Sequence, residues 1–94
     1  MAFVGGFTAP KPADDETRAA FETEEIRAAV SAKLGYDVNS LSVISFKTQV
    51  VAGINYRVHA NINGEKNIVF QAFRPLPHTG LPIDVKSAEE GDAL

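Results

Sequence analysis

The sequence contains no cysteine among its 94 residues. This absence excludes disulfide bonds, thiolate metal ligands and a cysteine nucleophile. Small secreted domains usually carry disulfides, so a chain without them is more typical of a reducing compartment inside the cell. The uncharged segment 1–7 is too short for a signal peptide, and no apolar run approaches the roughly 20 residues of a membrane span. We therefore expect a cytoplasmic protein that does not enter membranes.

Clustered positive charge is also lacking. The net charge is −3, and the basic residues stand singly instead of forming a patch or a stripe with aromatic residues, so nucleic acid is not an expected partner. The apolar share of 45% and the charged share of 22% are ordinary for a globular chain. A chain of this length is expected to form a single domain over residues 1–94.

No motif of a known catalytic site is present. The only histidines are His59 and His78, which have no metal-ligand spacing between them and are expected to be surface residues. The adjacent acids Asp14-Asp15 and Glu24-Glu25 lie on a predicted exposed helix, where carboxylates stay solvated. The sequence therefore predicts a protein that is not an enzyme and that holds neither a cofactor nor a metal ion.

One long helix is predicted over residues 14–34. Asp14 or Asp15 can accept hydrogen bonds from the first-turn N–H groups, and Gly35 is a natural residue to end the helix. Good helix formers dominate the segment. The expected buried stripe consists of Ala19, Thr23, Ile26, Val30 and Leu34.

The rest of the chain is typical of strands and turns. Residues 41–51 are rich in β-branched and aromatic residues, and residues 54–62 alternate between apolar and polar side chains. Asn63-Gly64 is a strong hairpin signal. Further strands are expected at 68–73 and 81–85. One helix followed by a four-stranded antiparallel meander predicts an α+β fold.

Both ends of the chain are expected to lie outside this meander. Residues 1–13 hold glycines and prolines without a helical period, which indicates an extended, mobile arm. The acidic tail 87–94 is expected to be loose. Phe3 and Val4 stand just before Gly5-Gly6, and two interpretations remain open for them: part of a binding segment, or a frayed terminus.

Two loops carry apolar residues where polar ones are expected. The first is Gln49-Val50-Val51-Ala52-Gly53, in which Gly53 can adopt a positive φ so that the chain reverses. Val50 and Val51 either face a partner or end a strand and pack inward. The second is Leu76-Pro77-His78, stiffened by neighbouring prolines. In an up-and-down meander both turns lie at the same end of the sheet, and the N-terminal arm can reach it.

With these residues the sequence resembles the cystatin family, in particular its stefin branch. Gln49–Gly53 matches the family's Q-x-V-x-G motif, Leu76–His78 resembles the second stefin hairpin, and Gly5-Gly6 with Lys11-Pro12-Ala13 resembles the stefin N-terminus. The resemblance covers about residues 4–85. The chain departs from the family in the C-terminal segment from Ile83, which lacks the aromatic residues usual in the last stefin strand.

The resemblance implies a sheet of five antiparallel strands wrapped around one long helix. It also implies reversible, tight, competitive inhibition of papain-like cysteine proteases such as the cathepsins. Three elements would form a wedge in the protease's active-site cleft, and a Gly53→Glu change would weaken inhibition while sparing the fold. The wedge residues would be Phe3, Val4, Gly5, Gly6, Gln49, Val50, Val51, Ala52, Gly53, Leu76, Pro77 and His78.

Two alternatives remain. The chain could be a binding module of the same fold that has lost inhibition. It could also exchange the half that contains the helix with a second copy by straightening the first hairpin, because Val50 and Val51 tolerate an extended hinge. A monomer is the expected state, with such a swapped dimer as a side behaviour.

Overall fold

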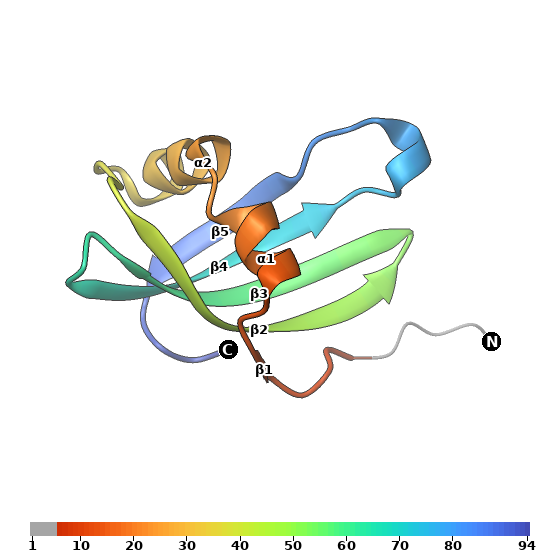
Figure 1. Ribbon diagram of the computed structural model, residues 1–94, viewed down its shortest axis with the longest axis horizontal. Coiled ribbons are helices and arrows are strands. Elements are labelled where there is room, and N and C mark those ends of the chain that lie inside the picture. The colour runs from red at the N-terminus through yellow and green to blue at the C-terminus, as the bar shows by residue number, and fades with distance from the viewer. Residues whose placement is uncertain (1–5) are drawn as a thin grey trace.

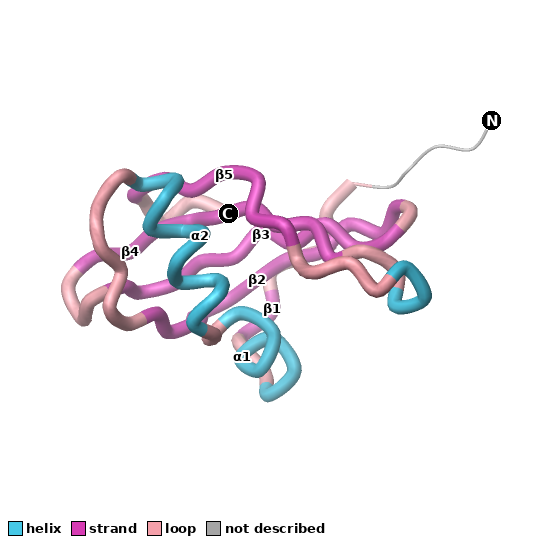
Figure 2. The backbone as a smooth tube through the Cα atoms, turned by 90° about the horizontal axis from the view of Figure 1, so that it is seen from above, coloured by secondary structure: helices cyan, strands magenta, loops and turns pink. Residues whose placement is uncertain are grey.

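The computed structural model describes residues 6–94, in which a five-stranded antiparallel sheet packs against two helices (Figure 1). Each strand pairs with the next one in the sequence, so the sheet order is β1-β2-β3-β4-β5. Both helices lie on one face of the sheet (Figure 2). The α+β fold is therefore confirmed. The elements are β1 (Lys11–Pro12), α1 (Asp15–Phe21), α2 (Glu24–Leu34), β2 (Leu41–Val51), β3 (Gly53–Ile62), β4 (Lys66–Arg74) and β5 (Asp84–Glu90).

The single long helix expected over residues 14–34 is wrong, although both of its ends are confirmed. Asp14 caps α1 by accepting the backbone N–H of Thr17 at 2.8 Å, and Gly35 ends α2 with a φ of 86°. Between them the backbone of Thr23 is extended, and its hydroxyl accepts the N–H of Ile26 at 3.2 Å. Thr23 is therefore the N-cap of a second helix, since a threonine oxygen satisfies a donor that a continuous helix would bond internally.

The break changes which residues face the sheet. In α1 the buried residues are Thr17 and Phe21, whereas Ala19 is exposed, so the stripe predicted through Ala19 does not continue. Glu22, at the break, accepts the N–H of Val43 with its carboxylate at 2.9 Å and thereby holds the junction against β2. The two helices can thus each present an apolar side to a twisted sheet.

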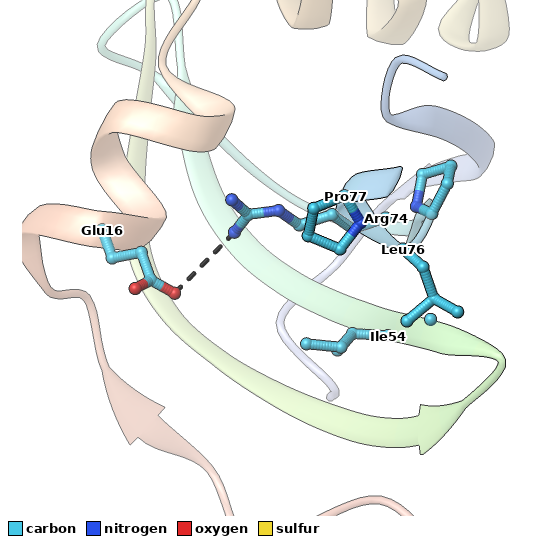
Figure 3. A pocket seen from close by; sticks show the side chains of 7 residues that line it. Glu16, Ile54, Arg74, Leu76 and Pro77 are labelled. Carbon is cyan, nitrogen blue, oxygen red and sulfur yellow. Dashed lines mark ion pairs between the residues drawn. The ribbon is translucent and has the colours of Figure 1, made fainter. Parts of the chain in front are cut away.

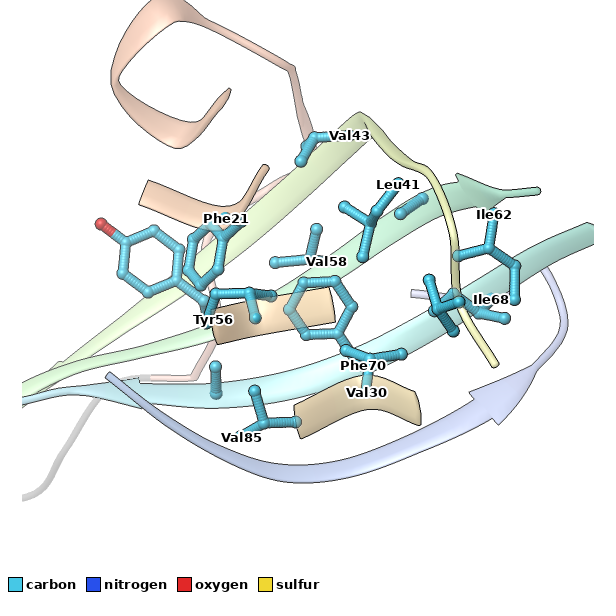
Figure 4. Close-up of a cluster of buried hydrophobic side chains, with 14 of the residues drawn as sticks. Phe21, Val30, Leu41, Val43, Tyr56, Val58, Ile62, Ile68, Phe70 and Val85 are labelled. Carbon is cyan, nitrogen blue, oxygen red and sulfur yellow. The ribbon is translucent and has the colours of Figure 1, made fainter. Parts of the chain in front are cut away.

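Phe21 lies at the centre of the core between the helices and the sheet (Figure 4). Its ring meets those of Tyr56 and Phe70 edge-on, with centroid separations of 4.9 and 5.6 Å. Such pairs contribute about 0.5–1.5 kcal/mol beyond the burial of their surface. The strands β3 and β4 form the sheet side of this core, because their alternate side chains face the helices.

The predicted hairpin at Asn63-Gly64 is confirmed. Both residues have a positive φ, 55° and 69°, as a tight turn between right-twisted strands requires. β2 and β3 are paired over their full lengths, from Leu41 opposite Ile62 to Val51 opposite Gly53. This long hairpin carries the first candidate loop at its far end.

The last strand lies later in the chain than the sequence predicts. It covers Asp84–Glu90 instead of residues 81–85, and the tail expected to be loose from Ser87 pairs with β4 as far as Glu90. Glu90 accepts hydrogen bonds from the hydroxyl of Tyr36 at 2.7 Å and the ammonium of Lys66 at 3.2 Å. Pairing with β4 and these contacts outweigh the weak strand propensity of the segment.

The N-terminal arm is extended, as expected, but part of it is anchored. Lys11 and Pro12 form β1 opposite Phe46 and Ser45, and the N–H of Thr8 donates to the carbonyl of Thr48 at 2.8 Å. The arm therefore follows β2 toward the end where the β2–β3 turn lies.

Candidate functional site

The turn between β2 and β3 presents an exposed aliphatic side chain. Val51 is paired with Gly53, so Ala52 is the one residue between the two strands. The side chain of Val50 is 73% exposed, while Val51 is half-buried. Of the two interpretations left open for this pair, the structure supports outward exposure for Val50.

Gly53 is buried and its φ is +131°, as the expected chain reversal requires. A Cβ atom at this position would lie 2.6 Å from the ring of Phe73 and 2.7 Å from the carbonyl oxygen of Arg74. The expectation that a Gly53→Glu change spares the fold is therefore wrong, because any side chain would collide with backbone as well as with a ring. Gly53 lets β4 approach the turn closely.

Gln49 contributes less to the surface than its place in the motif suggests. Its side-chain oxygen accepts a hydrogen bond from the amide of Asn55 across the hairpin, at 3.1 Å. This cross-strand bond fixes the base of the turn on the face of the sheet away from the helices.

The second loop connects β4 to β5 and contains a single 3-10 turn at Pro77–Thr79. The hydroxyl of Thr79 donates to the carbonyl of Leu76 at 2.7 Å and accepts the N–H of Leu81 at 3.3 Å. One side chain thus clamps both ends of the turn. Pro75 and Pro77 restrict the backbone further, and Leu76 is 41% exposed at the tip.

The two loops lie at the same end of the sheet (Figures 1 and 2). They share a hollow of about 250 Å³, shown in Figure 3. In it the guanidinium of Arg74 lies 3.7 Å from the carboxylate of Glu16, which connects the base of the second loop to α1. The hollow is lined by Glu16, Gly53, Ile54, Arg74, Pro75, Leu76 and Pro77.

Of the N-terminal residues predicted to belong to the site, Gly6 is described and exposed. Phe3, Val4 and Gly5 lie outside the described residues. Phe7 follows, with the ammonium of Lys47 5.6 Å from the centre of its ring. The direction of the arm along β2 agrees with the expectation that it approaches the loop end.

His59 is not the surface residue that the sequence suggested. Its side chain is only 15% exposed, and its Nε2 lies 2.9 Å from the carboxylate of Asp92, because residues 91–94 fold back over β3 and β4. Asn67 donates to the same carboxylate at 2.7 Å. The hydrogen bonds from Asn67 and His59 hold the pKa of Asp92 below its usual range. His78 is exposed on the second loop.

Within residues 6–94, no group of three or more His, Cys, Asp or Glu side chains is arranged to hold a metal ion. Over the same residues no helix is long and apolar enough to cross a bilayer. The loop end itself exposes the aliphatic side chains of Val50 and Leu76, which suits contact with another protein.

Two residues that shape this end escaped the sequence analysis. Phe73 lies against the Gly53 position, and Arg74 holds the second loop to α1. An aromatic and a charged residue at the end of a predicted strand were visible in the sequence, but only the register, with Ile54 opposite Arg74, shows that they lie beside the first turn.

No family model matches the chain. Among individual proteins, the chain is 30% identical to Cystatin-B of Mus musculus over 83 residues, which are 88% of this chain and 83% of that protein. It is 27% identical to Cystatin-A1 of Sus scrofa, over 86% of this chain and 77% of that protein. It is also 28% identical to a Sus scrofa protein named Leukocyte cysteine proteinase inhibitor 1, over 85% of this chain and 76% of the other.

Proposed function

The chain belongs to the stefin branch of the cystatin family, and we propose that it inhibits papain-like cysteine proteases, the cathepsins among them, reversibly and in competition with substrate. It is not an enzyme. Residues 1–94 would act as one inhibitor domain. The lack of cysteine fits a reducing compartment, and we assign the inhibitor to the cytoplasm.

The observation that carries this proposal is that Val50 and Leu76 are both exposed, on two loops that lie at the same end of the sheet. Large aliphatic side chains at loop tips are unfavourable in water and become favourable when a partner covers them. Full burial of one such side chain contributes about 1.5–3 kcal/mol. Because the hairpins are already formed, little ordering entropy opposes binding.

The wedge would have three parts. Gln49, Val50, Val51, Ala52 and Gly53 would fill the centre of the protease cleft, and Leu76, Pro77 and His78 the primed side. Phe3 and Val4 would occupy the non-primed subsites, with Gly5 and Gly6 crossing near the catalytic cysteine without side chains.

The geometry of the first turn supports blocking without cleavage. Val51 and Gly53 are held opposite each other by strand pairing, with Ala52 between them. Where the chain reverses so tightly, its peptide bonds are not presented in the orientation that a nucleophile needs for attack. The inhibitor would therefore occupy the cleft without being cut, and a complex without a covalent bond could dissociate again.

A titration of papain with a fluorogenic substrate tests the proposal when wild type is compared with Val50→Asp and Ile44→Asp. Ile44 is a matched control because it is also an exposed aliphatic residue of β2, but lies away from the turn. Val50→Asp should raise the inhibition constant by about 10- to 100-fold, since a lost burial of about 1.4 kcal/mol is tenfold. Equal constants for the two variants would show that the turn does not enter the cleft.

A binding module that has lost inhibition is the competing interpretation, and it would leave wild-type protein inactive against every papain-like enzyme tried. For the oligomeric state we propose a monomer. Straightening residues 50–53 would instead join β2 and β3 into one strand and allow a swapped dimer. Size-exclusion chromatography before and after heating separates these two states.

A further inference from the structure

Four large hydrophobic side chains within residues 6–94 are exposed, and three of them belong to the two loops that lie at one end of the sheet. Val50 and Leu76 belong to the proposed wedge, but the third, Leu81, does not. Leu81 is 65% exposed, second only to Val50 among these four. An isolated exposed leucine needs no explanation, whereas one on a loop that already carries an exposed residue of the proposed wedge indicates a larger contact surface.

Leu81 borders a hollow separate from the one between the loops. This second hollow has a volume of about 350 Å³ and is lined by Phe73, Pro75, Leu81, Pro82, Ile83 and Asp84. Five of these residues are apolar. The one charge, on Asp84, is paired with the ammonium of Lys86 at 2.7 Å. The hollow therefore favours an apolar side chain over a charged ligand.

The side chain of Thr79 bonds to the backbone of both Leu76 and Leu81. The Thr79 hydroxyl bonds the carbonyl of Leu76 on one side and the N–H of Leu81 on the other, so the two leucines flank one short turn. Pro75 lines both hollows, so a protein surface seated on Leu76 lies close to one that would cover Leu81. Pro82 restricts the backbone directly after Leu81, which reduces the ordering entropy that binding would cost.

We propose that Leu81 and the hollow beside it extend the protease contact past the three-part wedge and receive an exposed apolar side chain from the primed-side rim of the target. This inference rests on the proposed inhibitory function, because it assumes that Leu76 is seated in a protease. It assigns target preference to Leu81: proteases with an apolar rim would be bound more tightly than those with a charged rim.

The test compares Leu81→Ser with Ile44→Ser, a control of equal size on β2, in inhibition of papain and of cathepsins that differ in rim polarity. Leu81→Ser should raise the inhibition constant about tenfold for an apolar-rimmed protease, mainly through faster dissociation, and Ile44→Ser less than twofold. Circular dichroism and thermal melting check that both variants fold. Constants within twofold of wild type for every protease would overturn the inference while leaving inhibition itself standing.

A photo-crosslinking residue at position 81 gives a second, direct readout. Placed there, benzoylphenylalanine should crosslink to the inhibited protease, and at position 44 it should not. Crosslinking from position 50 without any from position 81 would also overturn the inference. If wild type fails to inhibit at all, the proposed function falls and the inference falls with it, so the two failures are distinguishable.

Discussion

Gly53→Ala is the most informative single substitution in this chain, because Gly53 is packed against β4 and also belongs to the proposed wedge. A Cβ atom would overlap the ring of Phe73 at 2.6 Å and the carbonyl oxygen of Arg74 at 2.7 Å. The ring could rotate, but the backbone carbonyl belongs to β4 and cannot move without disturbing the sheet. The φ of +131° adds strain for any residue with a side chain.

Backbone strain of this kind costs about 1–3 kcal/mol. An overpacked contact costs about 1–3 kcal/mol more. We expect a combined loss near 3 kcal/mol, which lowers the melting temperature of a domain this small by about 12–24 °C. Gly64→Ala is the matched control. Its φ is also positive, +69°, but nothing lies within 4 Å of its added Cβ, so only about 1 kcal/mol should be lost.

Differential scanning calorimetry of the two variants measures the difference. Combining Gly53→Ala with Phe73→Leu should recover part of the loss, because the smaller side chain removes one of the two collisions and the sites are coupled. A melting temperature for Gly53→Ala no lower than that for Gly64→Ala would refute the argument. Gly53 would then be needed for the protease contact alone.

Two further predictions concern the core and the tail. Phe21→Ala removes a fully buried ring from the centre of the core and should destabilise the protein by about 3–5 kcal/mol, measured as a lower urea midpoint at unchanged slope; a loss below about 1 kcal/mol would contradict the packing described. Asp92→Asn tests the tail: the pKa of Asp92 is lowered, so its contribution is present above the ordinary value of 3.8 and disappears as pH falls through the folded-state pKa. The variant should melt below wild type at neutral pH and converge with it in acid, whereas a constant difference at all pH values would refute the linkage.

Sequence patterns predicted the central hairpin best. Regular alternation over residues 54–62 and the Asn63-Gly64 pair are local signals that the fold preserves. The helix break was also encoded locally, since Thr23 precedes two glutamates as an N-cap commonly does, but the good helix formers on both sides concealed it.

The position of β5 could not be predicted from local signals. Residues 87–90 are serine, alanine and two glutamates, which have low strand propensity, while the more apolar Leu81-Pro82-Ile83 forms part of the loop. Pairing with β4 and the hydrogen bonds that Glu90 accepts from Tyr36 and Lys66 determine the position of β5. These contacts join segments far apart in the sequence, which propensity does not capture.

In the candidate site, too, local features were predictable from the sequence and contacts between distant segments were not. The Gln49–Gly53 and Leu76–His78 segments were visible as apolar loops, and up-and-down topology predicted that they share an end. The close approach of Phe73 to Gly53 was invisible, because it depends on the register between β3 and β4. So was the fold-back of the C-terminal residues that covers His59.

Inhibition is measured most directly as the activity of papain, or of a cathepsin, titrated with wild-type protein at several substrate concentrations. We expect full loss of protease activity at or below micromolar inhibitor. We also expect an apparent inhibition constant that rises linearly with substrate concentration, and protease activity that returns on dilution. Unchanged activity at micromolar inhibitor, or inhibition that is independent of substrate concentration, would contradict the proposed function.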